Sequence, residues 1–303
     1  MFYCGNLCRP LLSKIQFALI MVSSPKPLIA YGWLRAILCF ICFLLFYILL
    51  SSVVNSAVKG SSNHPFSPSV TLFIEVLVVN ISFFISAWVF RKFVDRRSFF
   101  SLGFQWNSSY ARLGLLVAFG VIGIGALLLM ALHVLQFSGA SFLPGPFLFT
   151  VLIFGLVAFG EELFFRGYIL NNLLQSLNKW IALGISALLF MFVHLDNPGA
   201  TASLLPIMAI LIGGLLFGIN YIYTKNLYFG ICLHFAWNFL QGPVLGFDVS
   251  GTSSSPIFSH TLKGSTLLTG GTFGYEGSII CVSLSVAALV ILILKYERGQ
   301  RTN

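Results

Sequence analysis

Charged residues are scarce in this chain of 303 residues. Asp, Glu, Lys and Arg together make up 8% of the sequence, whereas they make up about 25% of an ordinary soluble domain. Hydrophobic residues account for 58%, in apolar runs that are too many and too long to form a single soluble core. The sequence therefore excludes a soluble globular protein and predicts an integral membrane protein.

Two familiar patterns of cysteine and histidine are also missing. The six cysteines lie mostly in apolar runs, where Cys behaves as a small hydrophobic residue, and they indicate no disulfide framework. Cys39 and Cys42 have CxxC spacing, but no second pair accompanies them, which favours packing over a metal or redox site. No HExxH sequence occurs, which excludes the usual zinc-protease helix.

Eight apolar segments have lengths near the roughly 20 residues that a membrane-spanning helix needs. The predicted fold class is therefore all-α, a polytopic bundle of about eight transmembrane helices. The segments are residues 31–54, 71–90, 112–136, 147–170, 180–195, 201–219, 226–244 and 278–294.

The basic residues predict the orientation of this bundle. If the N-terminus is cytoplasmic, fourteen Lys and Arg residues fall on the cytoplasmic side, and only Lys59 and Lys263 fall on the other. Because cytoplasmic loops are enriched in Lys and Arg, we expect both termini in the cytoplasm. This placement explains the net charge of +9, so no nucleic-acid partner is predicted. The fourteen are Arg9, Lys14, Lys26, Arg35, Arg91, Lys92, Arg96, Arg97, Arg112, Lys179, Lys225, Lys295, Arg298 and Arg301.

The stretch from Gly160 to Gly167 places three ionisable side chains inside an apolar run. A charge at that depth costs at least ~2.5–3.5 kcal/mol on insertion scales, so such residues are candidates for function. Glu162 and Arg166 are four residues apart and share a helix face, so they can pair. Glu161 is rotated by about 100° from Glu162 and has no local cation. One carboxylate is therefore expected to be held and the other free for chemistry.

Three more polar side chains lie in later apolar segments. His194 follows Phe190 by four residues, and His234 and Asn238 are four apart on one helix face. Taken singly, each is explained as an interhelical hydrogen-bonding group. Together with Glu161, they form one polar pocket if the fourth, fifth and seventh segments pack together. A carboxylate can take a proton from water, and imidazole and amide groups can stabilise an oxyanion.

The same atoms allow a second chemistry. Glu161, His194 and His234 form a common ligand set for catalytic Zn2+, with water in the fourth position. The residues alone leave metal-activated and carboxylate-activated water as open alternatives.

Three motifs in order carry a resemblance to a known family. Glu161–Arg166 reads EExxxR, Phe190–His194 reads FxxxH and His234–Asn238 reads HxxxN. This series resembles the CPBP family of intramembrane proteases, which includes type II CAAX prenyl endopeptidases, lysostaphin-resistance-A-like proteins and bacteriocin self-immunity proteins. The resemblance covers about residues 147–245.

The resemblance implies a role for each motif residue. Glu161 would activate water with the help of His194, and His234 and Asn238 would stabilise the oxyanion. It also implies a cavity open to lipid and cytoplasm. The substrate would be a membrane-associated or lipidated peptide or protein in a bacterial inner membrane, and prenyl specificity is not carried over. The pair Glu162 and Arg166 would be structural or would position substrate.

We therefore divide the chain into three parts. Residues 1–145 hold the first three membrane helices, a cytoplasmic N-terminus and a basic loop. Residues 146–245 are the expected catalytic core, and residues 246–303 hold a non-cytoplasmic loop and the last helix. Residues 245–277, rich in Gly, Ser and Thr, are expected to be a flexible connector, with a lid as the alternative.

Two other functions compete with the protease. One is a non-catalytic membrane scaffold or immunity protein that keeps the polar residues for structure. The other is a proton-coupled transporter that uses Glu161 and the histidines as a relay. Transporters of that kind often show inverted repeats and broken helix pairs, and the sequence shows no such symmetry.

Overall fold

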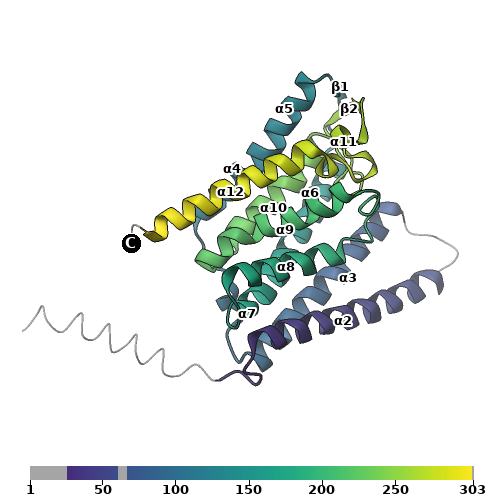
Figure 1. Ribbon diagram of the computed structural model, residues 1–303. Coiled ribbons are helices and arrows are strands. Elements are labelled where there is room, and N and C mark those ends of the chain that lie inside the picture. Colours follow the sequence, from purple (N-terminus) through teal and green to yellow (C-terminus); the bar gives the residue numbers. More distant parts are fainter. Residues whose placement is uncertain (1–25, 61–66, 302–303) are drawn as a thin grey trace, which may run out of the picture.

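The computed structural model describes residues 26–60 and 67–301, which form a helical bundle with a small sheet at one end (Figure 1). Within these residues, six helices are long and apolar enough to cross a membrane. This confirms a mostly helical, integral membrane protein. The six are Gly32–Ala57, Pro68–Val94, Ser108–Ala131, Pro144–Leu173, Leu204–Thr224 and Ile279–Arg301.

The two remaining predicted spans, residues 180–195 and 226–244, are helical but shorter. The first corresponds to α8 (Lys179–Val193), with 15 residues. The second corresponds to α10 (Tyr228–Phe239), with 12 residues, and continues as a π-helical turn. Eight crossings and two cytoplasmic termini therefore stay predictions.

The elements follow one another in the chain with short connections, and η denotes a π-helix (η1, η3, η4, η5) or a 3-10 helix (η2, η6, η7). In order they are α2 (Gly32–Gly60), α3 (Pro68–Val89), η1 (Phe90–Val94), η2 (Phe99–Leu102), α4 (Ser108–Ala118), η3 (Phe119–Gly123), α5 (Ile124–Ala131), β1 (Leu135–Ala140), α6 (Pro144–Glu161), η4 (Glu162–Leu170), α7 (Asn171–Leu173), α8 (Lys179–Val193), α9 (Leu204–Thr224), α10 (Tyr228–Phe239), η5 (Leu240–Val244), β2 (Phe258–Leu262), α11 (Thr266–Thr269), η6 (Gly271–Phe273), η7 (Tyr275–Gly277) and α12 (Ile279–Arg301).

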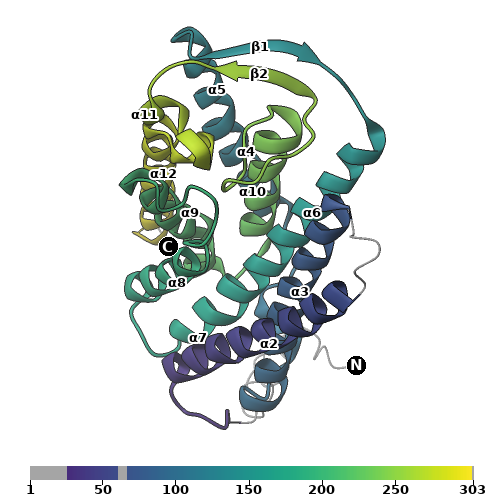
Figure 2. The ribbon, with the colours of Figure 1, turned by 90° about the vertical axis from the view of Figure 1, so that its right-hand side faces the viewer.

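Helix α10 lies at the centre of the bundle, in contact with α4, α6 and α9 (Figures 1 and 2). Small residues permit this close packing. A Cβ on Gly114 of α4 would lie only 2.4 Å from the Phe229 carbonyl oxygen of α10. Aromatic side chains fill the space between α2, α3 and η4, where Phe83 stacks on Phe43 at 4.5 Å and Phe164 is fully buried. Helix α10 is thus packed against three other helices.

Helix α6 continues without a break into η4, whose nine residues are all buried. A π-helix has more residues per turn than an α-helix and is frequently found at functional sites. The change begins at Glu162, directly after Glu161. The sequence pattern predicted a plain α-helix here, and the wider turn changes which way the following side chains point.

A buried ionic cluster fastens the first two helices at the end of the bundle near α7. Asp95, which is fully buried, accepts hydrogen bonds from Arg35 at 2.8 Å and from Arg91 at 2.9 Å. The hydroxyl of Tyr168 and the amide of Asn172 also donate to Asp95, each at 3.3 Å. These bonds connect α2, and η1 at the end of α3, to η4 and α7 of the core.

Residues 245–277 are not a simple connector. Strand β2 within them pairs antiparallel with β1, from Leu135 opposite Leu262 to Ala140 opposite Phe258 (Figure 2). Three short helices follow before α12. The prediction of a flexible connector is therefore wrong for this segment, and part of it reaches the cavity described below.

Candidate active site

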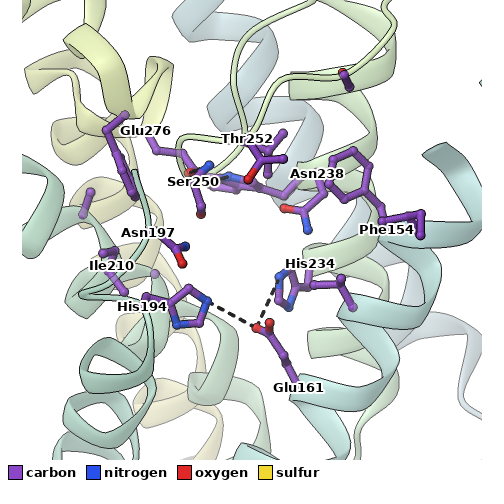
Figure 3. A pocket seen from close by; sticks show the side chains of 18 of the residues that line it. Phe154, Glu161, His194, Asn197, Ile210, His234, Asn238, Ser250, Thr252 and Glu276 are labelled. Carbon is purple, nitrogen blue, oxygen red and sulfur yellow. Dashed lines mark hydrogen bonds and ion pairs between the residues drawn. The ribbon is translucent and has the colours of Figure 1, made fainter. Parts of the chain in front are cut away.

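A cavity of about 230 Å³ lies between α3, α6, α8, α9, α10 and the loop that follows η5. All four residues that the sequence singled out for chemistry line it: Glu161, His194, His234 and Asn238 (Figure 3). They come from α6, from the end of α8 and from α10. The expected convergence of three segments on one polar pocket is therefore present.

Glu161 lies between the two imidazoles. Its Oε2 atom is 3.6 Å from Nε2 of His194 and 3.9 Å from Nε2 of His234. The side chain is 15% exposed, and Oε2 is shielded and accepts no hydrogen bond from the residues that the structure describes. A buried acceptor without a partner is destabilising by about 1–3 kcal/mol, and by more when it is charged. This oxygen is therefore available to a water molecule or to a substrate in the cavity.

His194 is fixed by the turn that it ends. Its Nδ1 lies 2.7 Å from the carbonyl oxygen of Phe190. A carbonyl oxygen only accepts hydrogen bonds, so Nδ1 carries the proton and Nε2 of the neutral ring is an acceptor. The ring also lies against the Phe190 ring, at 4.3 Å between centroids. The FxxxH spacing therefore directs the bare Nε2 of His194 toward Glu161.

His234 is fixed by the second carboxylate. Its Nδ1 lies 3.2 Å from Oε1 of Glu162, and the same oxygen is 2.7 Å from Nη1 of Arg166. Arg166 also donates from Nη2 to the Gly214 carbonyl oxygen at 3.1 Å. The predicted ion pair between Glu162 and Arg166 is thus present and buried. The contact between Glu162 and His234 was not predicted, because the two residues lie on different helices.

Asn238 lies one turn after His234, and its side chain points into the cavity (Figure 3). Asn197 faces it from the other side, on the turn that follows α8. Neither amide side chain makes a hydrogen bond to a described residue, so both can bind a substrate. Asn197 was missed, because an Asn in a turn after a helix is usually explained by the turn itself.

The wall opposite Glu161 was missed entirely. It consists of residues of the loop 249–254 together with Glu276. Ser250 and Thr252 point into the cavity from this side (Figure 3). A Ser- and Thr-rich loop far along the chain has no spacing that would connect it with the three motifs.

The zinc alternative gains no support from the geometry. Across residues 26–60 and 67–301, no group of three or more His, Cys, Asp or Glu side chains could hold a metal ion. Glu161, His194 and His234 stay a predicted ligand set, and metal dependence is a matter for experiment.

The comparisons with known proteins agree with the motifs. Residues 142–240 match a family model described as type II CAAX prenyl endopeptidase Rce1-like. The matched stretch runs from the start of α6 through α10 and contains all three motifs, which confirms the resemblance to the CPBP family. A comparison with curated proteins found no match. The family match supports a CAAX-protease-like intramembrane endopeptidase in general.

Proposed function

We propose that this chain, a member of the CPBP family through residues 142–240, cleaves a peptide bond of a membrane-associated or lipidated protein with water activated by Glu161. One observation carries the proposal. Oε2 of Glu161 accepts no hydrogen bond from the part of the chain that the structure describes, and it lies in the cavity wall 3.6 and 3.9 Å from Nε2 of two imidazoles.

In the first step, Glu161 takes a proton from a water molecule whose oxygen attacks the scissile carbonyl carbon. Nε2 of His194 accepts a hydrogen bond from the second O–H of that water and so orients the molecule. The acceptor on His194 is fixed before substrate binds, because Nδ1 of the same ring is held by the Phe190 carbonyl oxygen. Such a positioned base contributes about 10²–10⁴-fold to a rate.

The oxyanion that forms is stabilised by the amide of Asn238 and by the His234 ring. Nδ1 of His234 lies 3.2 Å from Oε1 of Glu162 and donates to that carboxylate. In the proposed mechanism Nε2 of the same ring carries a second proton, which it donates to the oxyanion. His234 then transfers the Nε2 proton to the departing amine, and the proton on Glu161 restores the imidazolium. Hydrogen bonds aimed at a developing negative charge are often the largest contribution to such catalysis.

The cavity favours an apolar chain beside the scissile bond, since Leu72, Val76 and Phe154 line the side formed by α3 and α6. This lining fits a lipid chain as well as a hydrophobic peptide, so it assigns no prenyl group. With the predicted orientation, eight crossings place both termini in the cytoplasm. We place the protein in a bacterial inner membrane.

The test uses purified full-length protein in nanodiscs with internally quenched peptides that carry an apolar half. Glu161→Gln keeps the shape of the side chain but removes the base, and cleavage is expected to fall by about 10²–10⁴-fold. Glu75→Gln is the matched control, because Glu75 is exposed on α3 and does not line the cavity. Equal cleavage by Glu161→Gln and wild type would refute the proposal.

A chelator arm decides between the two ways of activating water. Cleavage that survives 1,10-phenanthroline supports the carboxylate alone. Loss of cleavage that added Zn2+ restores would assign Glu161, His194 and His234 to a metal. The scaffold and transporter alternatives predict no cleavage by the wild-type protein, and the transporter predicts proton flux that Glu161→Gln abolishes.

A further inference from the structure

The wall opposite Glu161 comes from outside the stretch that matches the family. Residues 249–254 follow η5, and Ser250, Thr252, Ser253 and Ser254 all line the cavity. Figure 3 shows Ser250 and Thr252 across the cavity from Glu161. A substrate bound at Glu161 therefore meets a surface of hydroxyl groups. None of the described residues that line this cavity is Lys or Arg.

Glu276 fixes this wall to the helix that carries the oxyanion groups. Its Oε1 accepts a hydrogen bond from Nε1 of Trp237 at 2.8 Å. Its Oε2 accepts from the backbone N–H of Ser250 at 2.9 Å and from the Ser250 hydroxyl at 3.1 Å. Trp237 lies on α10 between His234 and Asn238. One carboxylate thus sets the distance between the hydroxyl wall and the reacting groups.

Further contacts hold the wall from two other sides. Gln241 donates to the Asp248 carbonyl oxygen at 2.6 Å. Gly251 has a φ of +78°, donates to the Phe273 carbonyl oxygen at 3.1 Å, and lies so close to Pro198 that a Cβ would be 2.0 Å from its oxygen. The segment is therefore packed in place as part of the cavity.

The lining of the cavity thus has two chemically different parts. Leu72 and Val76 of α3 and Phe149 of α6 form an apolar part, here called the apolar end, and residues 249–254 form the polar part. Phe154 lies where the two parts meet, because a Cβ on Gly242 would be 3.0 Å from its ring and 3.1 Å from Oγ of Ser254.

The Ser250 and Ser253 hydroxyls already donate to Glu276 and Asp248, so they accept a hydrogen bond from a substrate. The Thr252 hydroxyl can both donate and accept. This set suits uncharged polar side chains and peptide groups. An acidic residue would approach the Glu276 carboxylate without a cation to offset its charge.

We propose that residues 249–254, positioned by Glu276, form a subsite for uncharged polar residues on one side of the scissile bond, while the apolar end binds apolar residues on the other side. This inference rests on the proposed function. It makes Glu276 a positioning residue and the hydroxyl wall the element that selects substrate.

The experiment uses full-length protein in nanodiscs and internally quenched peptides of one frame. Each peptide has an oligoleucine half, joined to a half made of Ser and Thr, of Leu or of Asp. Wild-type kcat/KM for the Ser/Thr peptide is expected to exceed the other two by about tenfold, the scale of one or two hydrogen bonds. Glu276→Ala is expected to lose this preference, mainly through a higher KM for the Ser/Thr peptide. Glu276→Gln keeps one acceptor for Trp237 and should lie between the two.

Two further variants make the result specific to the wall. Ser250→Ala with Thr252→Val removes two hydroxyls, keeps the Ser250 backbone N–H for Glu276, and should reduce the preference even if Glu276→Ala does not fold. Glu297→Ala is the matched control. Glu297 on α12 also accepts hydrogen bonds from two other elements, from Lys179 on α8 and Tyr223 on α9, but it does not line the cavity. Its peptide preference should equal that of wild type.

Binding separates this inference from the proposed function. Fluorescence anisotropy with the Glu161→Gln variant measures affinity for the same peptides without cleavage. The Ser/Thr peptide should bind about tenfold more tightly than the Leu peptide, and Glu276→Ala should remove the difference. If the wild-type protein cleaves none of the peptides but this binding preference is present, only the proposed hydrolysis is refuted. Binding or cleavage without discrimination, or an equal loss for all peptides in Glu276→Ala, would overturn the subsite.

Discussion

Replacing Arg166 by Met tests whether the buried pair with Glu162 holds the site together. Arg166 donates to Glu162 and to the Gly214 carbonyl oxygen, and its guanidinium lies 4.6 Å from the Phe190 ring centroid. Met fills much of the same volume but removes the charge. Glu162, which is 0% exposed, then keeps one partner, Nδ1 of His234 at 3.2 Å.

The expected loss follows from what remains buried. Removing one partner of a buried ion pair destabilises a protein by about 3–5 kcal/mol, because the other charge is left uncompensated. Oε2 of Glu162 already has no hydrogen-bond partner among the described residues, so Glu162 has no alternative contact to compensate. Arg166→Met is therefore expected to lower the free energy of unfolding by about 3–5 kcal/mol.

The second substitution separates stability from catalysis. Replacing both members by apolar residues, as in Glu162→Leu with Arg166→Met, is expected to restore most of the lost stability, since buried pairs contribute little beyond their apolar replacements. Activity should stay low, because His234 then lacks the carboxylate at Nδ1. The pair that bonds at the same distance near the surface, Lys179 and Glu297 at 2.7 Å, is the control.

The assay is reversible unfolding in mixed micelles with a denaturing detergent, alongside peptide cleavage. Lys179→Met should change the unfolding free energy by about 0–1 kcal/mol, since the two side chains are 29% and 35% exposed. A loss below about 1 kcal/mol for Arg166→Met would contradict the argument. So would a double variant as unstable as the single one, or a double variant with wild-type cleavage.

Two more substitutions test neighbouring contacts. Gly230→Ala would place a Cβ 2.3 Å from Oε2 of Glu162. We therefore expect about 1–3 kcal/mol of destabilisation from overpacking, together with reduced cleavage. Wild-type values in both assays would show that the carboxylate can move. Asp95→Ala leaves Arg35 and Arg91 buried without their shared acceptor. The free energy of unfolding should fall by about 3–5 kcal/mol. An unchanged free energy of unfolding would mean that solvent reaches the cluster.

The part of the site around Glu161, His194 and His234, here called the inner end, could be predicted from the sequence because helix periodicity is a local property. Four-residue spacing places Glu162 with Arg166 and His234 with Asn238, whatever the rest of the fold does. The scarcity of charge made each polar residue within an apolar segment conspicuous. Convergence on Glu161 then required only that three neighbouring segments pack together.

The wall formed by residues 249–254 and Glu276 could not be predicted in this way. Glu276 contacts Trp237 across 39 residues, and Ser250 across 26. Such contacts depend on how a loop of Gly, Ser and Thr settles on the bundle, and these residues show no periodicity. The π-helical segment after Glu161 was likewise not predicted, because it continues α6 without a break and no Pro or Gly stands at the residue where it begins.

The charges at the inner end explain why two adjacent carboxylates can have different roles. Glu162 is neutralised by Arg166, which leaves Glu161 as the uncompensated charge beside the rings of His194 and His234. Under the proposed mechanism, Glu161 takes the proton from water, whereas Glu162 holds Nδ1 of His234. Because net charge in a membrane is costly, the pairing with Arg166 allows Glu162 to stay buried beside Glu161. We therefore expect Arg166 to affect cleavage through Glu162 and His234, although it does not line the cavity.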